Sequence, residues 1–171
     1  MNELSILMHL LSKKDTTHQK GANKDEILTT LNLKDKNKEV HFNNLITQLA
    51  RYIHPLGLEI RFNPLDGHWF LSFEQDISDL LQANPFEDKP KLAATLFCVL
   101  TCCMKNFGAA RMAEIEKLRK KKTTLQDLKE LENMGFLELD DDQSKVSLTP
   151  LIGYQLDLEK LFIKLALNAK Q

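Results

Sequence analysis

The sequence predicts a mainly α-helical fold with small β-hairpin wings, an α+β protein made of two tandem winged-helix domains. Three observations predict it. The first half reads as three helices followed by a hairpin, the second half repeats that order, and a polar stretch with two prolines at 84–90 separates the halves. A chain of 171 residues suits one domain or two of roughly 80 residues each. The repeated order favours two.

Three stretches of helical periodicity open the N-terminal half. Apolar residues recur three or four positions apart over 4–11, 27–31 and 42–53, with a polar loop between the first two stretches. Asn23, followed three residues later by Glu26, is typical of a helix N-terminus. We therefore expect a short second helix and a longer third one.

A change of period after the third helix predicts the first wing. Polar and apolar residues alternate over 58–63, turn residues follow at 64–67, and a second strand is expected over 68–73. Trp69 and Phe70 are consecutive in that strand, so they point to opposite faces. One of them therefore cannot join the helical core. It packs either on an amphipathic helix, which is expected over 74–83, or on a partner.

The second half repeats this order. Apolar periodicity predicts three helices, the last beginning at Thr123, and then a hairpin around the acidic turn 140–142. An amphipathic helix is expected over 156–167, and its apolar stripe must be covered by its own domain or by another chain. The predicted domains are residues 1–84, which include the linker helix 74–83, and residues 85–171.

Composition and motifs argue against catalysis and cofactor binding. The five histidines lack the spacing of zinc motifs, and glycine-rich phosphate loops are absent. Cys98, Cys102 and Cys103 lie in one apolar helix without a nearby histidine, which indicates reduced, buried thiols. We expect no enzyme activity, no metal and no cofactor. Without a secretory signal or a long apolar stretch, a cytoplasmic protein is expected.

Charge gives two candidate DNA contacts. The net charge of −1 creates no global field, so any contact must be local. The densest basic cluster lies before the third helix of the second domain and supplies candidate phosphate contacts at Arg119, Lys120, Lys121 and Lys122. Acidic residues in the following helix and wing tip disfavour DNA there, so this turn is either solvated or a weak contact. The first-domain third helix carries residues that suit DNA or any exposed face: Lys36, Lys38, His41, Asn43, Asn44, Gln48 and Arg51.

Several segments resemble a known family. They are residues 57–60, 67–71, 80–81, 91–96, 112–119 and 128–137. Together they resemble ScpB, the tandem winged-helix accessory subunit of prokaryotic SMC–kleisin complexes, over about residues 45–161. The family's Gln-Pro-Ile-Thr segment is replaced here at 105–111, and the segment between its last two strands is reduced to 140–145. These departures favour a divergent member, with an archaeal one among the options.

The resemblance implies a function. It implies homodimerisation through the first domain, capture of a kleisin chiefly by the second, and through it a link to an SMC ATPase at the nucleoid. Candidate partner contacts, chosen as apolar anchors and basic rim residues, are Leu158, Phe162, Leu165, Arg111 and Lys117. DNA contact would then be weak or indirect, and membrane contact is not expected.

Two alternatives stay open. A winged-helix transcription regulator would read DNA with the third helix of the first domain, and it would bind duplex with a steep salt dependence. A tandem winged-helix subunit of another assembly, such as an ESCRT-II-like or transcription-factor complex, would share the fold and differ in its partner.

Overall fold

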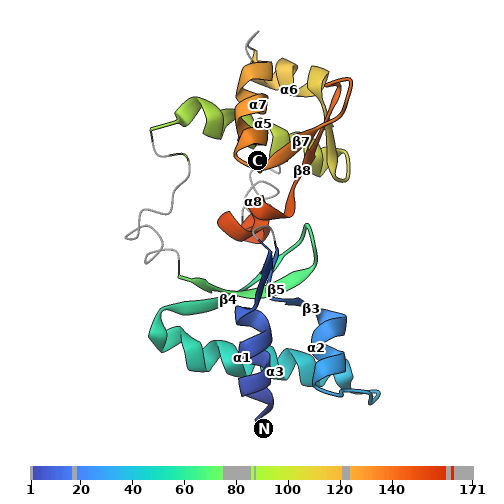
Figure 1. Cartoon of the computed structure of the whole chain (residues 1–171), viewed down its shortest axis with the longest axis vertical. Coiled ribbons are helices and arrows are strands. Elements are labelled where there is room, and N and C mark those ends of the chain that lie inside the picture. Colours follow the sequence, from blue (N-terminus) through green and yellow to red (C-terminus); the bar gives the residue numbers. More distant parts are fainter. Residues whose placement is uncertain are drawn as a thin grey trace. The chain divides into compact units, whose positions relative to one another are not determined.

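The computed structural model describes residues 2–16, 19–74, 86, 88–120, 124–160 and 163. It divides into two compact units: Met1–Ala83 with Asp157–Leu161, and Asn84–Leu156 with Phe162–Gln171. Each unit has its own helices and three-stranded antiparallel sheet, which confirms the tandem winged-helix fold (Figure 1). The expected domain limits stay a prediction, although Asp157–Leu161 groups with the first unit instead of the second. The expected helix at 74–83 lies outside the described residues, apart from Glu74.

The first unit follows the predicted order, with additional short strands. Its elements are α1 Glu3–Ser12, β1 Lys14–Thr16, β2 Gln19–Lys20, β3 Ala22–Asn23, α2 Lys24–Thr30, α3 Lys38–Ile53, the 3-10 turn η1 His54–Leu56, β4 Leu58–Asn63 and β5 His68–Phe73. The stretch expected as a loop between α1 and α2 thus contains three strands. Of these, β3 adds to the wing in the order β3-β5-β4.

Side-chain caps explain where two helices of the first unit begin. Asn2 precedes α1, and its side-chain oxygen accepts a hydrogen bond from the Leu4 backbone N–H at 3.1 Å. Asn23 precedes α2 and accepts from the Glu26 N–H at 2.8 Å, as the sequence predicted. Each bond satisfies one of the backbone donors that the first turn of a helix leaves unpaired.

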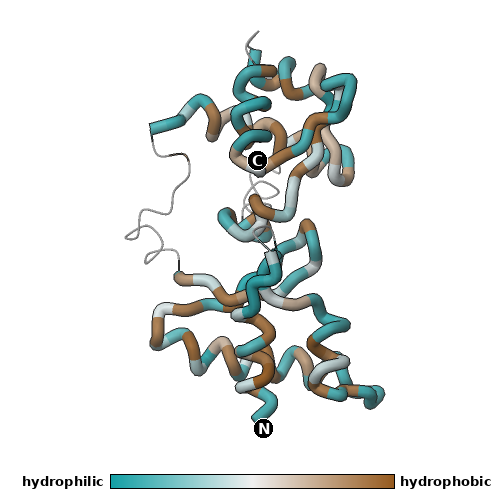
Figure 2. The backbone as a smooth tube through the Cα atoms, in the orientation of Figure 1, coloured by the Kyte–Doolittle hydropathy of each residue, from teal (hydrophilic) through white to brown (hydrophobic). Residues whose placement is uncertain are grey.

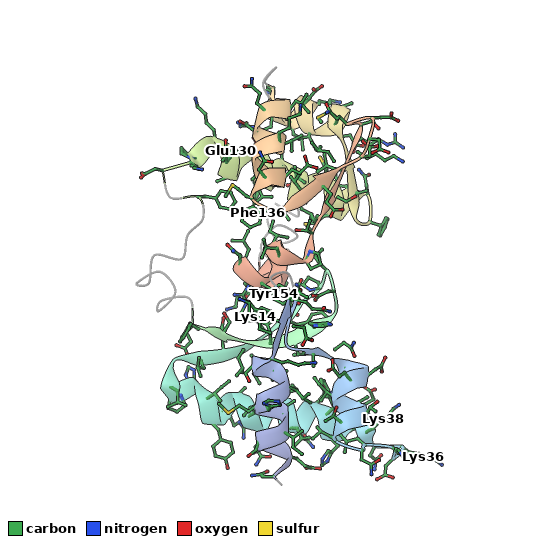
Figure 3. All side chains as sticks on the ribbon, in the orientation of Figure 1. Lys14, Lys36, Lys38, Glu130, Phe136 and Tyr154 are labelled. Atoms are coloured by element: carbon green, nitrogen blue, oxygen red, sulfur yellow. The ribbon has the colours of Figure 1, made fainter. Side chains whose placement is uncertain are left out.

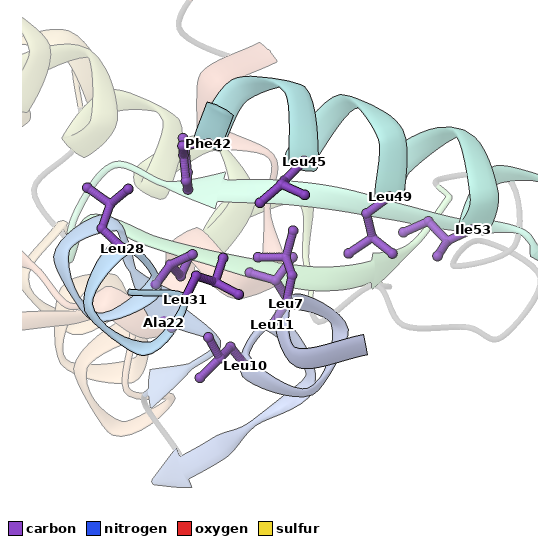
Figure 4. Packing of buried hydrophobic residues seen from close by; sticks show 11 residues of the cluster. Leu7, Leu10, Leu11, Ala22, Leu28, Leu31, Phe42, Leu45, Leu49 and Ile53 are labelled. Atoms are coloured by element: carbon purple, nitrogen blue, oxygen red, sulfur yellow. The ribbon is translucent and has the colours of Figure 1, made fainter. Parts of the chain in front are cut away.

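The core of the first unit lies between its helices and the inner face of the wing (Figure 4). Figure 2 shows the apolar residues recurring along α1 and α3 among hydrophilic ones. The buried cluster consists of Leu7, Leu10, Leu11, Ala22, Ile27, Leu28, Leu31, Phe42, Leu45, Leu49 and Ile53. The Trp69 ring packs onto this cluster, with its centroid 5.7 Å from that of Phe42 and 5.0 Å from that of Phe62.

Phe70 lies on the opposite, outer face of the wing and is only 1% exposed. It pairs across the hairpin with Arg61, whose guanidinium carbon is 5.4 Å from the centre of the ring. The two consecutive aromatics therefore do face opposite ways, and both are covered.

The second unit repeats this topology. Its elements are α5 Pro90–Lys105, β6 Ala109–Arg111, α6 Met112–Arg119, α7 Thr124–Asn133, β7 Leu137–Leu139, β8 Lys145–Leu148 and α8 Pro150–Gln155. As in the first unit, the strand before the second helix pairs with the second wing strand, in the order β6-β8-β7. The helix α8 was not predicted, although Pro150 at its first position is a common start signal.

The α7–wing junction also repeats the one in the first unit. Gly57 and Gly135 both have positive φ, 72° and 83°, and both lead from a helical segment into the wing. Left-handed backbone at this place favours glycine because other residues carry a Cβ that is crowded there. The sequences of these two segments are also similar, with Leu-Gly-Leu-Glu-Ile at 56–60 and Met-Gly-Phe-Leu-Glu-Leu at 134–139.

Candidate partner-binding and DNA-contact sites

Residues 157–160, which follow α8, lie on the outer face of the first wing. Lys160 Nζ is 3.9 Å from Glu59 Oε2, and Asp157 Oδ1 accepts a hydrogen bond from the Lys160 N–H at 3.1 Å. Burial lowers the pKa of the Arg61 guanidinium, and the nearby carboxylates of Asp157 and Glu59 oppose that shift. The segment thus brings charges of both signs against the wing.

Leu158, between these charged residues, is 1% exposed. It was expected to be an exposed partner anchor, and in this conformation its own chain covers it. Whether it contacts a partner therefore stays a prediction that would require the segment to leave the wing. The other two expected anchors, Phe162 and Leu165, lie outside the described residues.

Arg111 and Lys117 lie at the surface of the second unit. Arg111 ends β6 and immediately precedes α6, and Lys117 lies in the last turn of that helix. Both side chains are exposed. They are available as rim contacts, which remains a prediction.

Arg119, expected as a phosphate contact, instead belongs to a polar network inside the second unit. Its side chain is only 13% exposed, and Nη2 is 3.8 Å from Asp127 Oδ2. The same carboxylate oxygen accepts a hydrogen bond of 2.8 Å from the Thr95 hydroxyl, and Thr95 is fully buried. Nε and Nη2 of Arg119 are buried without a hydrogen-bond partner among the described residues. This geometry holds α5, α6 and α7 together and turns the guanidinium away from solvent.

Of the three lysines at 120–122, the structure describes Lys120. It is exposed and closes α6 in a left-handed conformation, with φ of 52°. Lys121 and Lys122 lie outside the described residues. A role for these lysines in DNA binding therefore stays a prediction.

The acidic residues of α7 take part in contacts within the second unit. Glu130 Oε1 is 3.0 Å from Lys89 Nζ, and Glu132 Oε1 accepts a hydrogen bond of 2.9 Å from the Leu139 N–H. Asp127 belongs to the Arg119 network. The helix therefore presents less free negative charge than its sequence suggests.

Asp140 likewise has a structural role at the tip of the second wing. Its Oδ1 accepts hydrogen bonds from the N–H groups of Ser144 at 2.7 Å and Lys145 at 3.0 Å, and its Oδ2 accepts one from the Ser144 hydroxyl at 3.0 Å. The hydrogen bond from the Lys145 backbone is the largest cause that lowers the pKa of Asp140 below its ordinary value. The carboxylate thus organises the turn.

Two apolar side chains of the second unit are more exposed than the sequence suggests. Phe97 on α5 is 45% exposed and Leu118 on α6 is 46% exposed. The spacing of Met112, Ile115 and Leu118 predicts one buried face for this helix, but only Ile115 of the three is buried. The helices α5 and α6 pack against each other. Helical spacing could have predicted the exposure of Phe97, because it lies outside the three- and four-residue spacing of the buried residues Leu92, Leu96 and Leu100.

Cys102 and Cys103 are buried, as the sequence predicted, whereas Cys98 is only partly buried. Burial raises the pKa of Cys98 and Cys102, and it raises that of Cys103 to about 11. Among the described residues, no group of three or more His, Cys, Asp or Glu side chains could hold a metal ion. No helix in the described part of the chain is long and apolar enough to cross a membrane.

Comparison with known proteins gives distant similarities. No protein-family model and no curated protein matches the sequence. A solved conserved hypothetical protein from Chlorobium tepidum is similar over 92% of this chain and 95% of its own, with 16% identity and a TM-score of 0.39. ScpB from Mycobacterium tuberculosis is similar over 93% of this chain and 94% of its own, with 14% identity and a TM-score of 0.34.

Proposed function

We propose that this protein is a non-enzymatic accessory subunit of an SMC–kleisin complex, binding the kleisin and supporting chromosome condensation and segregation at the nucleoid. The observation that carries the proposal is the tandem repetition of one topology, β3-β5-β4 in the first unit and β6-β8-β7 in the second. The sequence segments that resemble the ScpB family include both helix-to-wing junctions, at Gly57 and Gly135.

The second unit supplies the surface that we assign to the kleisin. Phe97 and Leu118 expose apolar area on adjacent helices, and the exposed cations Arg111 and Lys117 lie on or next to the second of them. Apolar anchors with polar surroundings dominate the binding energy of many protein interfaces, and Phe97 and Leu118 are the anchors that this proposal requires. A kleisin segment with apolar side chains and flanking acidic residues would complement this surface.

The first unit supplies the homodimer interface that the family resemblance implies. Its exposed apolar side chains include Met8 on α1, Tyr52 on α3 and Leu56 in η1, with 40%, 64% and 67% exposure. Exposed apolar area of this kind favours association with another protein surface.

Co-purification with the kleisin and SMC subunits of the same organism tests the proposal. We expect a stable complex with two copies of this chain per kleisin, measured by size-exclusion chromatography with mass determination. A protein that captures no kleisin and binds duplex DNA tightly, with a steep salt dependence, would instead be a transcription regulator.

Alanine variants test the assigned surface. Phe97→Ala combined with Leu118→Ala should weaken kleisin binding about 30-fold, as expected for a loss of about 2 kcal/mol at an interface anchor. Phe107→Ala is the matched control, since Phe107 is a fully exposed aromatic on the turn after α5. Equal weakening by the double variant and the control would refute the assignment of the surface.

A further inference from the structure

The outward face of α3 in the first unit is polar except for Val40, and it is free of acidic residues. The buried positions Phe42, Leu45, Leu49 and Ile53 fix the side of the helix that faces the core. The opposite side is formed by exposed residues: Asn37 just before the helix, then Val40, Asn44, Thr47, Gln48 and Arg51. From Val40 to Leu58 the sequence contains no Asp or Glu. This face therefore does not repel phosphates.

Positive charge gathers at the amino end of the same helix. Lys34, Lys36 and Lys38 are all exposed in and after the α2–α3 loop. Figure 3 shows Lys36 and Lys38 extending from this end of the first unit. Of the two acidic residues there, Glu39 forms an ion pair with Lys24, while Asp35 remains exposed. The excess of lysines over free carboxylates makes this end of α3 basic.

Charged groups on the neighbouring elements leave this face open. Glu3 on α1 pairs with His41 at 3.2 Å, which places both at the flank of α3 beside α1. Asp66 in the first wing accepts a hydrogen bond from the His68 N–H at 3.1 Å, within its own turn. The corresponding helix α7 of the second unit carries three acidic residues, Asp127, Glu130 and Glu132, whereas α3 carries only Glu39.

We propose that the first unit binds duplex DNA through α3, independently of any kleisin. The helix α3 enters the major groove as the second helix of a helix-turn-helix, with α2 before it. Lys34, Lys36 and Lys38 contact phosphates, which gives most of the affinity. Asn44 and Gln48 face the bases, where a side-chain amide pairs with the N6 and N7 atoms of adenine. The expected affinity is that of weak, mainly non-specific binding, with Kd on the order of 10⁻⁵ M near physiological salt.

Fluorescence anisotropy of a labelled 20-base-pair duplex, titrated with the full chain at 50 and 200 mM salt, tests the proposal. The triple variant Lys34→Gln, Lys36→Gln, Lys38→Gln should weaken binding at least tenfold at 50 mM. It should also reduce the slope of log K against log salt by about 2 to 3, since each phosphate contact contributes about 0.9.

The matched control is Lys105→Gln, Lys129→Gln, Lys145→Gln, which removes three exposed lysines from the second unit and changes the net charge equally. It should bind within about threefold of the unmodified protein if the contact is local. Trp69 fluorescence confirms that the first unit of each variant is folded. Equal weakening by both triple variants, or no binding by the unmodified protein at 50 mM salt, would overturn the proposal.

A protein partner on this face is the competing outcome. If the α3 triple variant loses kleisin capture and keeps duplex affinity, the face binds protein and the DNA proposal is wrong. Because the kleisin surface assigned above lies in the second unit, failure of kleisin capture by the unmodified protein leaves the DNA result unaffected. The two proposals therefore fail separately.

Discussion

At the scale of single residues, two glycines of the first unit differ in what surrounds them. Both have positive φ, 70° at Gly21 and 73° at Gly67. A Cβ added at Gly21 would lie 1.8 Å from the carbonyl oxygen of Trp69, whereas one at Gly67 would meet nothing within 4 Å. Gly21 thus allows β5 to approach β3 closely. Gly67 supplies the left-handed backbone conformation of the turn between β4 and β5.

Gly21→Ala should therefore destabilise the first unit by about 3 kcal/mol or more, because it adds backbone displacement to the strain of a left-handed residue. Gly67→Ala carries the strain without the steric conflict, so its expected cost is about 1 kcal/mol. Urea unfolding followed by the fluorescence of Trp69, the single tryptophan of the chain, measures both. Similar losses for the two variants would show that the close approach to β5 is unimportant.

At the scale of elements, the second wing depends on one carboxylate at its tip. Asp140 accepts hydrogen bonds from Ser144 and Lys145 across the turn between β7 and β8. A carboxylate whose pKa is lower in the folded state stabilises the fold above its unfolded pKa, and the stabilisation is lost as the pH falls through the folded pKa. The turn should therefore be well ordered at neutral pH and loosen in acid.

NMR titration of the Ser144 and Lys145 amide protons should show this directly. We expect both to titrate with a midpoint below about 3.9, the ordinary value for aspartate. In Asp140→Asn this titration should vanish, and both amides should exchange faster with solvent at neutral pH. Asp141→Asn, at the exposed neighbouring position, should leave both amides unchanged. A midpoint at or above the ordinary value would contradict the role of Asp140.

The sequence predicts the long elements well and the short ones poorly. Helical and strand periodicity identified α1, α3, α5 and both wings because each buries one face over many residues. The strands β1 and β2 contain two or three residues with no buried side chain, so they leave no hydropathy signal. For α8 the start signal was present in Pro150, but its six residues are too few for periodicity to show.

The candidate site was harder to predict because burial of charge depends on residues far apart in the sequence. Arg119 reads as part of a solvated basic run, and only the fold brings it beside Asp127 and Thr95 from two other helices. Leu118 and Phe97 are apolar residues that are exposed. The neighbouring helices decide whether an apolar residue at the edge of a helical stripe is buried, and the sequence does not show where those helices lie.

At the scale of the whole molecule, the chain returns to its first unit after completing the second wing. Asp157–Leu161 is grouped with the first unit, and Leu158 within it is buried. The stability of the N-terminal unit therefore depends on residues near the C-terminus. A change there should be detected at Trp69, more than half the sequence away.

Leu158→Ala should lower the free energy of unfolding of the first unit by about 2 to 3 kcal/mol, the usual range for removing a buried leucine side chain. The midpoint of the Trp69 fluorescence transition in urea measures this. Leu137→Ala is the matched control, because Leu137 is equally buried but belongs to the second wing. An unchanged Trp69 transition in Leu158→Ala, or an equal shift in both variants, would show that the segment does not support the first unit.

The return of residues 157–160 to the first wing also bears on how the protein is made. Synthesis completes the strand β5 long before Asp157 leaves the ribosome, so Glu59 and Arg61 on its neighbour β4 lack the charges of Lys160 and Asp157 while the second wing is translated. N-terminal domains generally fold first during synthesis, so the first unit folds before this segment is available to it. A fragment that ends after the first domain would lack these charge interactions and the buried side chain of Leu158.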